Sequence, residues 1–259
     1  MWPSLSKTHI WNFRTNSAPG IPKICVPIVG KTQGEIIEAG ENICAVGADI
    51  VEWRADWYED VFDLDKAEET AKELRAVLGG LPLLFTFRTS KEGGEKAVET
   101  AVYVELNQRM AESGYVDMVD VEVFTGDDAV RAVIETAHAC GVKTVASNHD
   151  FHKTPAKEEI VSRLCRMQKL GADILKIAVM PRDKKDLLTL LAATEEMYSE
   201  HADRPIITMS MGGTGVTSRL CGEVFGSAVT FGCAGKASAP GQVEARELRR
   251  VVEMLHGIV

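Results

Sequence analysis

Residues 171–179 read Gly-Ala-Asp-Ile-Leu-Lys-Ile-Ala-Val, and this short stretch carries most of the information about the fold. The apolar run predicts a buried β-strand over Asp173–Val179, and the glycine before it is a common stop signal for a preceding helix. Alternation along the strand gives two faces, with Leu175, Ile177 and Val179 on one and Ile174, Lys176 and Ala178 on the other. An apolar face that packs on helices, opposite a face that carries a lysine, fits a strand of a barrel.

Similar short runs recur along the chain, and each is followed by a stretch with helical periodicity. The other seven predicted strands are Lys23–Ile28, Asp49–Arg54, Leu83–Arg88, Val116–Glu122, Val142–Ser147, Pro205–Ser210 and Ala228–Phe231. Glycines at 47, 79, 114, 141 and 171 mark predicted helix ends. Eight β–α units in about 250 residues predict an α/β fold of the (β/α)₈ TIM-barrel type. An open doubly wound sheet is the alternative, but no G-x-G-x-x-G follows the first strand.

Nothing in the composition suggests a second domain, so we expect residues 1–259 to form a single barrel domain. Residues before Lys23 look like an extra N-terminal element, a hairpin that would close the bottom of the barrel. Pro27 does not fit its predicted place inside the first strand, because proline has no N–H to donate to a neighbouring strand. The sequence gives no reason for this proline.

Charge and cysteine content exclude several classes of protein. The net charge of −9, from 29 Lys and Arg against 38 Asp and Glu, argues against nucleic acid as a partner. No apolar run is long enough to span a membrane, and the N-terminus lacks the apolar core of a signal peptide. The six cysteines show no C-x-x-C spacing, so we expect reduced, buried thiols of a cytoplasmic protein rather than a zinc site or disulfides.

Ionisable residues fall on the inward faces of four predicted strands, mostly near their carboxyl ends, where barrel enzymes place their active sites. They are Glu52, Arg54, Arg88, Asp120, Glu122 and Lys176. The uncharged Thr86 faces inward with them. A structural network of buried ion pairs, such as Glu52–Arg54, is the alternative to direct chemistry for the carboxylates and Arg54. A buried lysine is rarer, and a desolvated amine is a nucleophile for ketones and aldehydes, so Lys176 is the candidate catalytic residue.

The fifth predicted strand runs into Ser147-Asn148-His149-Asp150-Phe151-His152-Lys153-Thr154-Pro155. His149 stands where that strand ends and can face the barrel mouth, where a histidine suits acid–base work beside a Schiff-base lysine. An exposed loop histidine is one alternative. Metal binding by His149 and His152 is another, but no third ligand cluster accompanies them. We expect no metal, and we expect His152 to be a loop residue.

The last two connections carry further candidates. Met209 and Met211 share an inward face, as core filler or as an apolar wall against a substrate ring. The run Gly212-Gly213-Thr214-Gly215 could cradle a phosphate, although loop flexibility explains a short glycine run equally well. Arg219 follows in the same connection. Ser238 and Gln242 lie on the loop after the eighth strand, which could close over the mouth and hold hydroxyl groups.

Together these motifs resemble the type I 3-dehydroquinate dehydratase family of the shikimate pathway. The resemblance covers nearly the whole chain from Lys23 onward. The matching segments are Glu52-Trp53-Arg54, Phe85-Thr86-Phe87-Arg88 with Lys91-Glu92-Gly93-Gly94-Glu95, Val116 to Asp120, Ser147 to Pro155, Gly171 to Pro181, and Ile206 to Gln242. The most specific are Ser-Asn-His-Asp-Phe-His-Lys-Thr-Pro at 147–155, Leu-Lys-Ile-Ala at 175–178 and Ala-Ser-Ala-Pro-Gly-Gln at 237–242.

The resemblance implies an enzyme without metal or cofactor that converts 3-dehydroquinate to 3-dehydroshikimate and water. It implies that Lys176 forms an imine with the substrate ketone, that His149 is the general acid and base, and that Glu92 orients the histidine. The remaining implied roles are substrate binding by Glu52, Arg54, Arg88, Arg219, Ser238 and Gln242, beside Met209 and Met211, and support of the site by Asp120. It also implies a cytoplasmic homodimer. A class I aldolase-like Schiff-base barrel and a non-catalytic quinate-type sensor are the alternatives.

Overall fold

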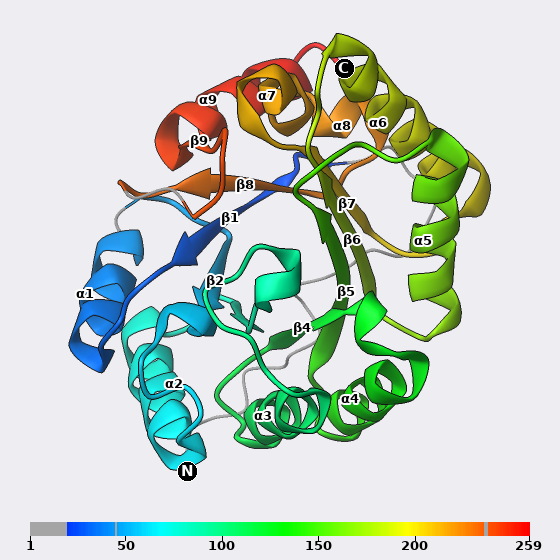
Figure 1. Cartoon of the computed structure of the whole chain (residues 1–259). Helices are drawn as coiled ribbons and strands as arrows, with labels where there is room; N and C mark the ends of the chain where they lie inside the picture. Colours follow the sequence, from blue (N-terminus) through cyan, green and yellow to red (C-terminus); the bar gives the residue numbers. More distant parts are fainter. Residues whose placement is uncertain (1–19, 45, 236–237) are drawn as a thin grey trace.

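The computed structural model describes residues 20–44, 46–235 and 238–259. The predicted N-terminal hairpin falls mainly on residues 1–19 and so lies outside the described residues. Within them, eight parallel strands form the barrel in Figure 1, at β1 Lys23–Ile28, β2 Ile50–Arg54, β3 Leu83–Thr86, β4 Met118–Glu122, β5 Lys143–Asp150, β6 Ile174–Val179, β7 Ile206–Ser210 and β8 Val229–Cys233. The strand order runs from β7 down to β1 and then to β8. This confirms the predicted TIM-barrel fold.

The two ends of that order meet at the start of β7 and β8, where one bridge closes the ring. Ile206 pairs with Ser227 there, and the backbone N–H of Ala228 donates to the carbonyl of Ile206 at 2.8 Å. The helices lie outside the ring, as Figure 1 shows. They are α1 Gln33–Cys44, α2 Leu64–Leu78, α3 Thr100–Glu112, α4 Asp127–Ala139, α5 Lys157–Lys169, α6 Lys184–Glu196, α7 Gly212–Leu220, α8 Gly222–Phe225 and α9 Ala245–His256.

Short helical turns follow several strands directly and shape the upper rim. They are η1 Ala55–Trp57, η2 Ser90–Glu92 and η3 Val123–Thr125. A π-helical turn, η4 Met197–His201, instead continues α6 toward the start of β7. A two-residue strand, β9 Val243–Glu244, pairs with β8 and was not predicted. The predicted strand ends also shift slightly. β3 stops at Thr86, before Arg88, whereas β5 continues through His149 to Asp150 and stays paired with β6.

The predicted alternation of side chains divides the apolar core into two parts. The larger part lies between the strands and the helices and includes Leu175, Ile177 and Val179 of β6. The smaller part lies inside the barrel and includes Ile174 and Ala178 of the same strand, with methionines and Phe231 from other strands. The closed ring is stabilised by burial of the outer faces of its strands, because helices pack against them.

A fourfold repeat at the bottom of the barrel ties neighbouring strands together. A residue one or two positions before each even-numbered strand accepts a hydrogen bond from one of the first three N–H groups of the strand before it. The pairs are Asp49 with Ile24, Asp117 with Leu83, Asp173 with Thr144, and the Ser227 hydroxyl with Thr208, at 2.8 to 3.1 Å. Each carboxylate also binds a cation, namely Arg249, Arg75 and Lys143 respectively. These contacts satisfy strand ends that would otherwise lack partners.

The structure explains Pro27. The N–H of Lys23 donates toward β8, at the Ala228 carbonyl, so the nitrogens of residues 25 and 27 face the same side. Pairing of β1 with β8 ends at Cys25 opposite Phe231, so the missing N–H of Pro27 has no strand to meet. The five predicted helix-ending glycines all have positive φ, from 56° at Gly79 to 97° at Gly171.

The expectation of buried thiols holds for Cys25 and Cys233 and only in part for the half-buried Cys165 and Cys221, and it is wrong for Cys140, which is exposed just after α4. Cys140 takes the αR conformation at the helix end, where the chain meets solvent. The side chain of Cys44 lies outside the described part of the structure. None of the helices in the described parts of the chain is both long enough and apolar enough to cross a membrane.

Candidate active site

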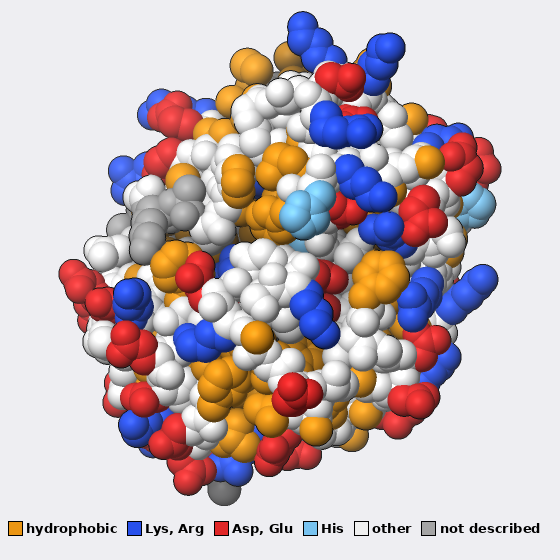
Figure 2. All heavy atoms as spheres, in the orientation of Figure 1, with side chains coloured by type: hydrophobic (Ala, Val, Ile, Leu, Met, Phe, Trp, Pro, Cys, Tyr) orange, Lys and Arg blue, Asp and Glu red, His pale blue; other side chains and the backbone are white. Residues whose placement is uncertain are grey.

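A pocket opens at the carboxyl ends of the strands, and its walls hold most of the predicted site residues. It is lined by Glu52, Arg54, Arg88, Glu92, Gly93, His149, Phe151, Lys176, Ala178, Met209, Met211, Arg219, Phe231, Ser238, Ala239 and Gln242. Charges of both signs mix over the surface seen in Figure 2. Selection of an anionic ligand therefore depends on the charges inside the pocket.

Lys176 lies at the centre of the barrel and is 3% exposed. Its Nζ is 3.2 Å from Glu52 Oε1, 3.6 Å from Asp120 Oδ2, and 4.3 Å from the centre of the Phe231 ring. All three are partners for a cation. The buried lysine is therefore paired, and the pairing offsets the cost of taking its charge out of water. Thr86 donates to the same Glu52 oxygen at 3.0 Å and holds it in place.

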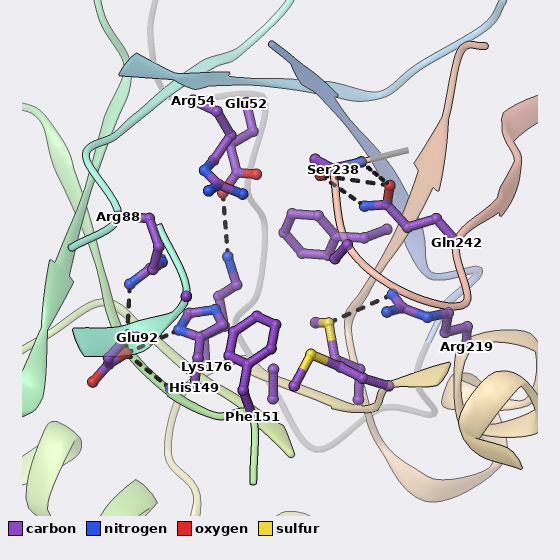
Figure 3. Close-up of a pocket in the computed structure, with 16 residues that line it drawn as sticks. Glu52, Arg54, Arg88, Glu92, His149, Phe151, Lys176, Arg219, Ser238 and Gln242 are labelled. Atoms are coloured by element: carbon purple, nitrogen blue, oxygen red, sulfur yellow. Dashed lines mark hydrogen bonds and ion pairs between the residues drawn. The ribbon is translucent and has the colours of Figure 1, made fainter. Parts of the chain in front are cut away.

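His149 points into the pocket from β5 and is held by Glu92 of η2 (Figure 3). Its Nδ1 is 3.0 Å from Glu92 Oε2, and its backbone N–H donates to the same oxygen at 2.8 Å. Asn148 donates its side-chain N–H to Glu92 Oε1 at 3.1 Å. Two contacts thus fix one carboxylate oxygen to His149, and the other ring nitrogen is left free for the pocket.

The protonation states of this pair are strongly shifted. Burial and the charge of Glu122 raise the pKa of Glu92 to about 8, against the opposing effects of Arg88 and Asn148. Burial and the nearby cations, Arg88 foremost, lower the pKa of His149 well below its usual value. Near neutral pH the imidazole is therefore uncharged while Glu92 retains a proton, so the two groups share one exchangeable proton.

Arg88 is surrounded by acceptors. Nη1 donates to Glu122 Oε1 at 2.9 Å and to Ser147 Oγ at 3.0 Å, and Nη2 donates to Asp120 Oδ1 at 2.8 Å. Nη1 also lies 3.6 Å from Glu92 Oε2. Arg88 therefore links the carboxylates around the lysine to the one beside the histidine. Asp120 is fully buried and does not line the pocket, as expected of a supporting residue.

The ion pair Glu52–Arg54 suggested by the sequence is wrong. Arg54 instead forms a two-pronged pair with Asp56 of η1, with Nε to Oδ1 and Nη2 to Oδ2 both at 2.8 Å. Since β2 ends at Arg54 and the chain turns into η1, Asp56 comes within reach. Glu52 is left free to face Lys176.

Arg219, from α7, is the cation of the pocket that has no carboxylate partner among the described residues. It is 2% exposed, donates to the Pro240 carbonyl at 3.2 Å, and lies 3.6 Å from Met209 Sδ. Its Nε has no hydrogen-bond partner in the described part of the chain, and burial lowers the pKa of Arg219 to about 10. A buried guanidinium left unpaired in this way is a ready receptor for an anionic group.

Ser238 and Gln242 approach from the loop after β8. The Ser238 N–H donates to Gln242 Oε1 at 2.8 Å, and Gln242 Nε2 donates to Ser238 Oγ at 3.1 Å. Lys236 and Ala237 of this loop lie outside the described residues. Met209 and Met211 line the wall below Arg219 and belong to the inner core. The glycine run 212–215 opens α7 rather than forming a free loop.

Some pocket residues were missed from the sequence. Phe151 and Phe231 form apolar walls. Alternation from His149 could have indicated Phe151, and Phe231 shares the inner face of β8 with Val229. Gly93 is the pocket residue that the sequence pattern indicates least. It has φ +84°, and the ring of Phe151 packs directly against it, because a Cβ at this position would lie 2.3 Å from Phe151 Cε2. The close approach holds η2, and with it Glu92, against the end of β5. The remaining candidate, His152, is exposed and does not line the pocket.

A charged pocket at the carboxyl ends of the strands is where barrel enzymes have their active sites, so the fold and the site together define an enzyme. Comparison with known proteins shows which class of enzyme it is. The sequence model of type I 3-dehydroquinase matches residues 24–259. The chain belongs to this family and is therefore a dehydratase, a carbon–oxygen lyase.

Individual relatives agree. A 3-dehydroquinate dehydratase of Listeria welshimeri is 60% identical over 237 residues, which is 92% of this chain and 94% of that protein. The crystal structure of the type I enzyme from Clostridium difficile, with covalently modified comenic acid, superposes with a TM-score of 0.90. It is 54% identical and covers 93% of this chain and 94% of its own. That of Geobacillus kaustophilus has a TM-score of 0.89 at 38% identity, covering 91% of both chains.

Proposed function

We propose that this pocket dehydrates 3-dehydroquinate to 3-dehydroshikimate through an imine on Lys176, with His149 as general acid and base. The observation that carries the proposal is the buried lysine at the pocket floor beside a histidine fixed by a buried glutamate. The covalently modified ligand of the Clostridium difficile relative supports covalent chemistry in this pocket.

The first step is formation of the imine. Lys176 loses a proton, for which Glu52 at 3.2 Å is the nearest acceptor, and its nitrogen attacks the C3 carbonyl carbon. The resulting carbinolamine loses its hydroxyl as water after receiving a proton. The proton shared by Glu92 and His149 supplies it, and this leaves His149 as a base with Nδ1–H directed to Glu92.

The second step is the elimination. The protonated imine acidifies the adjacent C2–H, which His149 removes, and the electron pair moves into the C2–C3 bond to give an enamine. The enamine then expels the C1 hydroxyl, which takes the same proton from His149 and leaves as water. A further water hydrolyses the conjugated imine, so Lys176 is regenerated and one water is released in total.

The other residues bind the substrate. Arg219 pairs with the carboxylate, because it is the buried cation without a carboxylate partner in the described part of the pocket. Ser238, Gln242, Glu52 and Arg54 hold the ring hydroxyls. Met209 and Met211 form the apolar wall. Asp120 supports the site through Lys176 and Arg88. Arg88 lines the pocket, and the family resemblance implies substrate binding, but its donors already serve Glu122 and Asp120, so we assign it a supporting role.

The test is borohydride reduction in the presence of 3-dehydroquinate. We expect a stable adduct on the peptide that contains Lys176, with the mass of the ligand less water plus two hydrogens, and enone absorbance that rises on turnover. Labelling of another lysine, or turnover without any trapped adduct, would contradict the assignment. Trapping without the enone product would favour a sensor or an aldolase-like barrel instead.

We also propose that the protein acts as a homodimer in the cytoplasm, as the family resemblance implies. Sedimentation equilibrium over a range of concentrations tests the dimer. A monomer at micromolar concentration would contradict it.

A further inference from the structure

A chain of hydrogen bonds leads from the outside of the barrel to the histidine, through two residues that the proposed mechanism does not use. Arg163 on α5 donates from Nη1 to Asn148 Oδ1 at 2.8 Å. Asn148 donates from Nδ2 to Glu92 Oε1 at 3.1 Å. Glu92 in turn holds His149 through Oε2. Asn148 is 4% exposed and lies next to His149 on β5, so its amide has little freedom to find other partners.

Arg163 determines which way the amide points. The two ends of an asparagine amide are similar in size, and its orientation depends on its neighbours. A guanidinium only donates, so the amide oxygen must face Arg163 and the amide nitrogen must face Glu92. Without Arg163 the oxygen could turn toward Glu92, where it would accept the proton of a neutral carboxyl but would repel an ionised one.

The position of Arg163 is itself well supported. Its Nε pairs with Glu159 Oε1 at 2.8 Å, one helical turn away, and its Cζ lies 5.3 Å from the centre of the Phe124 ring. Its side chain is 17% exposed. These contacts hold the guanidinium so that a third group, Nη1, is directed to Asn148.

We infer that Arg163 and Asn148 are positioning residues that fix the Glu92 carboxylate and thereby set the tautomer and basicity of His149. Each oxygen of Glu92 then has its own N–H donor, Asn148 on Oε1 and the His149 backbone on Oε2. A carboxylate held in this way presents Oε2 to the Nδ1–H of His149 and leaves Nε2 without a proton, ready to act as a base. The inference rests on the proposed role of His149.

The charge of the pair depends on the same contact. The hydrogen bond from Asn148 favours the ionised form of Glu92 and so opposes the burial that raises its pKa. If the amide turns around, Glu92 should keep its proton to higher pH. The form of the pair in which His149 is a free base would then be reached only at higher pH.

Arg163→Met tests the inference, with Arg166→Met as the matched control. Arg166 lies on the same helix, stacks on the same Phe124 ring at 5.3 Å and pairs with Asp127, but it has no hydrogen bond to Asn148. For Arg163→Met we expect kcat at pH 7 to fall on the order of 10-fold, the loss expected of one hydrogen bond to a charged group, with little change in KM. The rise of kcat with pH should move to higher pH, so that the deficit shrinks at pH 9.

Further variants separate positioning from a general loss of structure. Arg163→Lys keeps a donor toward Asn148 and should recover most of the activity and the wild-type pH profile. Asn148→Asp places a second carboxylate against Glu92 and should shift the profile further than Arg163→Met. At pH 9, above the pKa of about 8 for Glu92, the ¹⁵N NMR signals of the His149 imidazole should show the Nδ1–H tautomer in wild type and in Arg166→Met, with a mixture in Arg163→Met.

The tautomer measurement is independent of turnover, so the inference and the proposed function fail separately. An unchanged pH profile and tautomer in Arg163→Met would overturn the inference, even if borohydride trapping on Lys176 succeeds. An equal shift in Arg166→Met would show that loss of packing on Phe124, rather than the bond to Asn148, is responsible, and would also overturn it. Wild-type turnover by His149→Ala would instead defeat the proposed function.

Discussion

Replacement of Glu92 by glutamine should change the pH dependence of stability in a defined direction. In the folded protein, burial and the charge of Glu122 raise the pKa of Glu92 from 4.5 to about 8. Between these two values the folded state holds a proton that the unfolded chain has lost. The stability contributed by the protonated carboxyl is therefore fully present below the unfolded pKa, and it is lost as the pH rises through the folded pKa.

The magnitude follows from the size of the shift. Each pH unit between the two pKa values lowers the free energy of unfolding by about 1.4 kcal/mol. Between pH 6 and pH 9 the loss continues only to the folded pKa near 8, so it spans about two units, or about 3 kcal/mol. Glutamine does not ionise, and Glu92→Gln should lack this part of the decline.

A constant penalty accompanies the substitution but cancels in the comparison. Both Glu92 oxygens accept from N–H donors, whereas glutamine offers one oxygen and one NH₂ group, so one donor meets another. This costs about 1–3 kcal/mol at every pH. We therefore compare how the difference in stability between variant and wild type changes from pH 6 to pH 9.

Urea unfolding followed by circular dichroism at pH 6, 7, 8 and 9 gives the required free energies. The variant should gain about 3 kcal/mol on wild type over this range. Glu95→Gln, which changes an exposed side chain on the same loop, is the control and should leave the difference constant. Parallel curves for wild type and Glu92→Gln would refute a proton held on Glu92.

The other predictions concern the remaining groups of the pocket. His149→Ala should react with the substrate slowly and then stall as a covalent adduct, with turnover reduced ~10²–10⁴-fold, whereas near wild-type turnover would exclude the acid–base role. Lys176→Met leaves Glu52 and Asp120 without their shared cation, so chemical unfolding at pH 7 should show a free energy of unfolding lower by about 3–5 kcal/mol. A variant as stable as wild type would mean that the ion pairs make no net contribution to stability. Arg219→Met should raise the midpoint of thermal unfolding, because it removes a buried cation without a carboxylate partner in the described part of the pocket, and should abolish substrate binding measured by calorimetry. Tight binding by the variant would exclude Arg219 as the partner of the substrate carboxylate.

Local rules of sequence are enough to predict the barrel and the side of each strand on which the chemistry lies. Alternation in β2, β4 and β6 leaves only one arrangement in which every apolar face is covered, so Lys176, Glu52 and Asp120 had to point inward. The same local rule placed His149 on the inner face near the mouth. The ends of several helices could also be predicted from local sequence, because a residue that must adopt positive φ is nearly always glycine.

How these groups pair depends on the three-dimensional fold. Glu52 faces Lys176, 124 positions away, rather than its near neighbour Arg54, which turns instead to Asp56. Glu92 meets His149 and Asn148 because η2 folds over the end of β5, a contact that depends on Phe151 lying against Gly93. Periodicity fixes the direction of a side chain from its own strand. Which charge it meets depends on the register and curvature of the closed sheet and on the path of the loops, and these are set by packing between residues far apart in the chain.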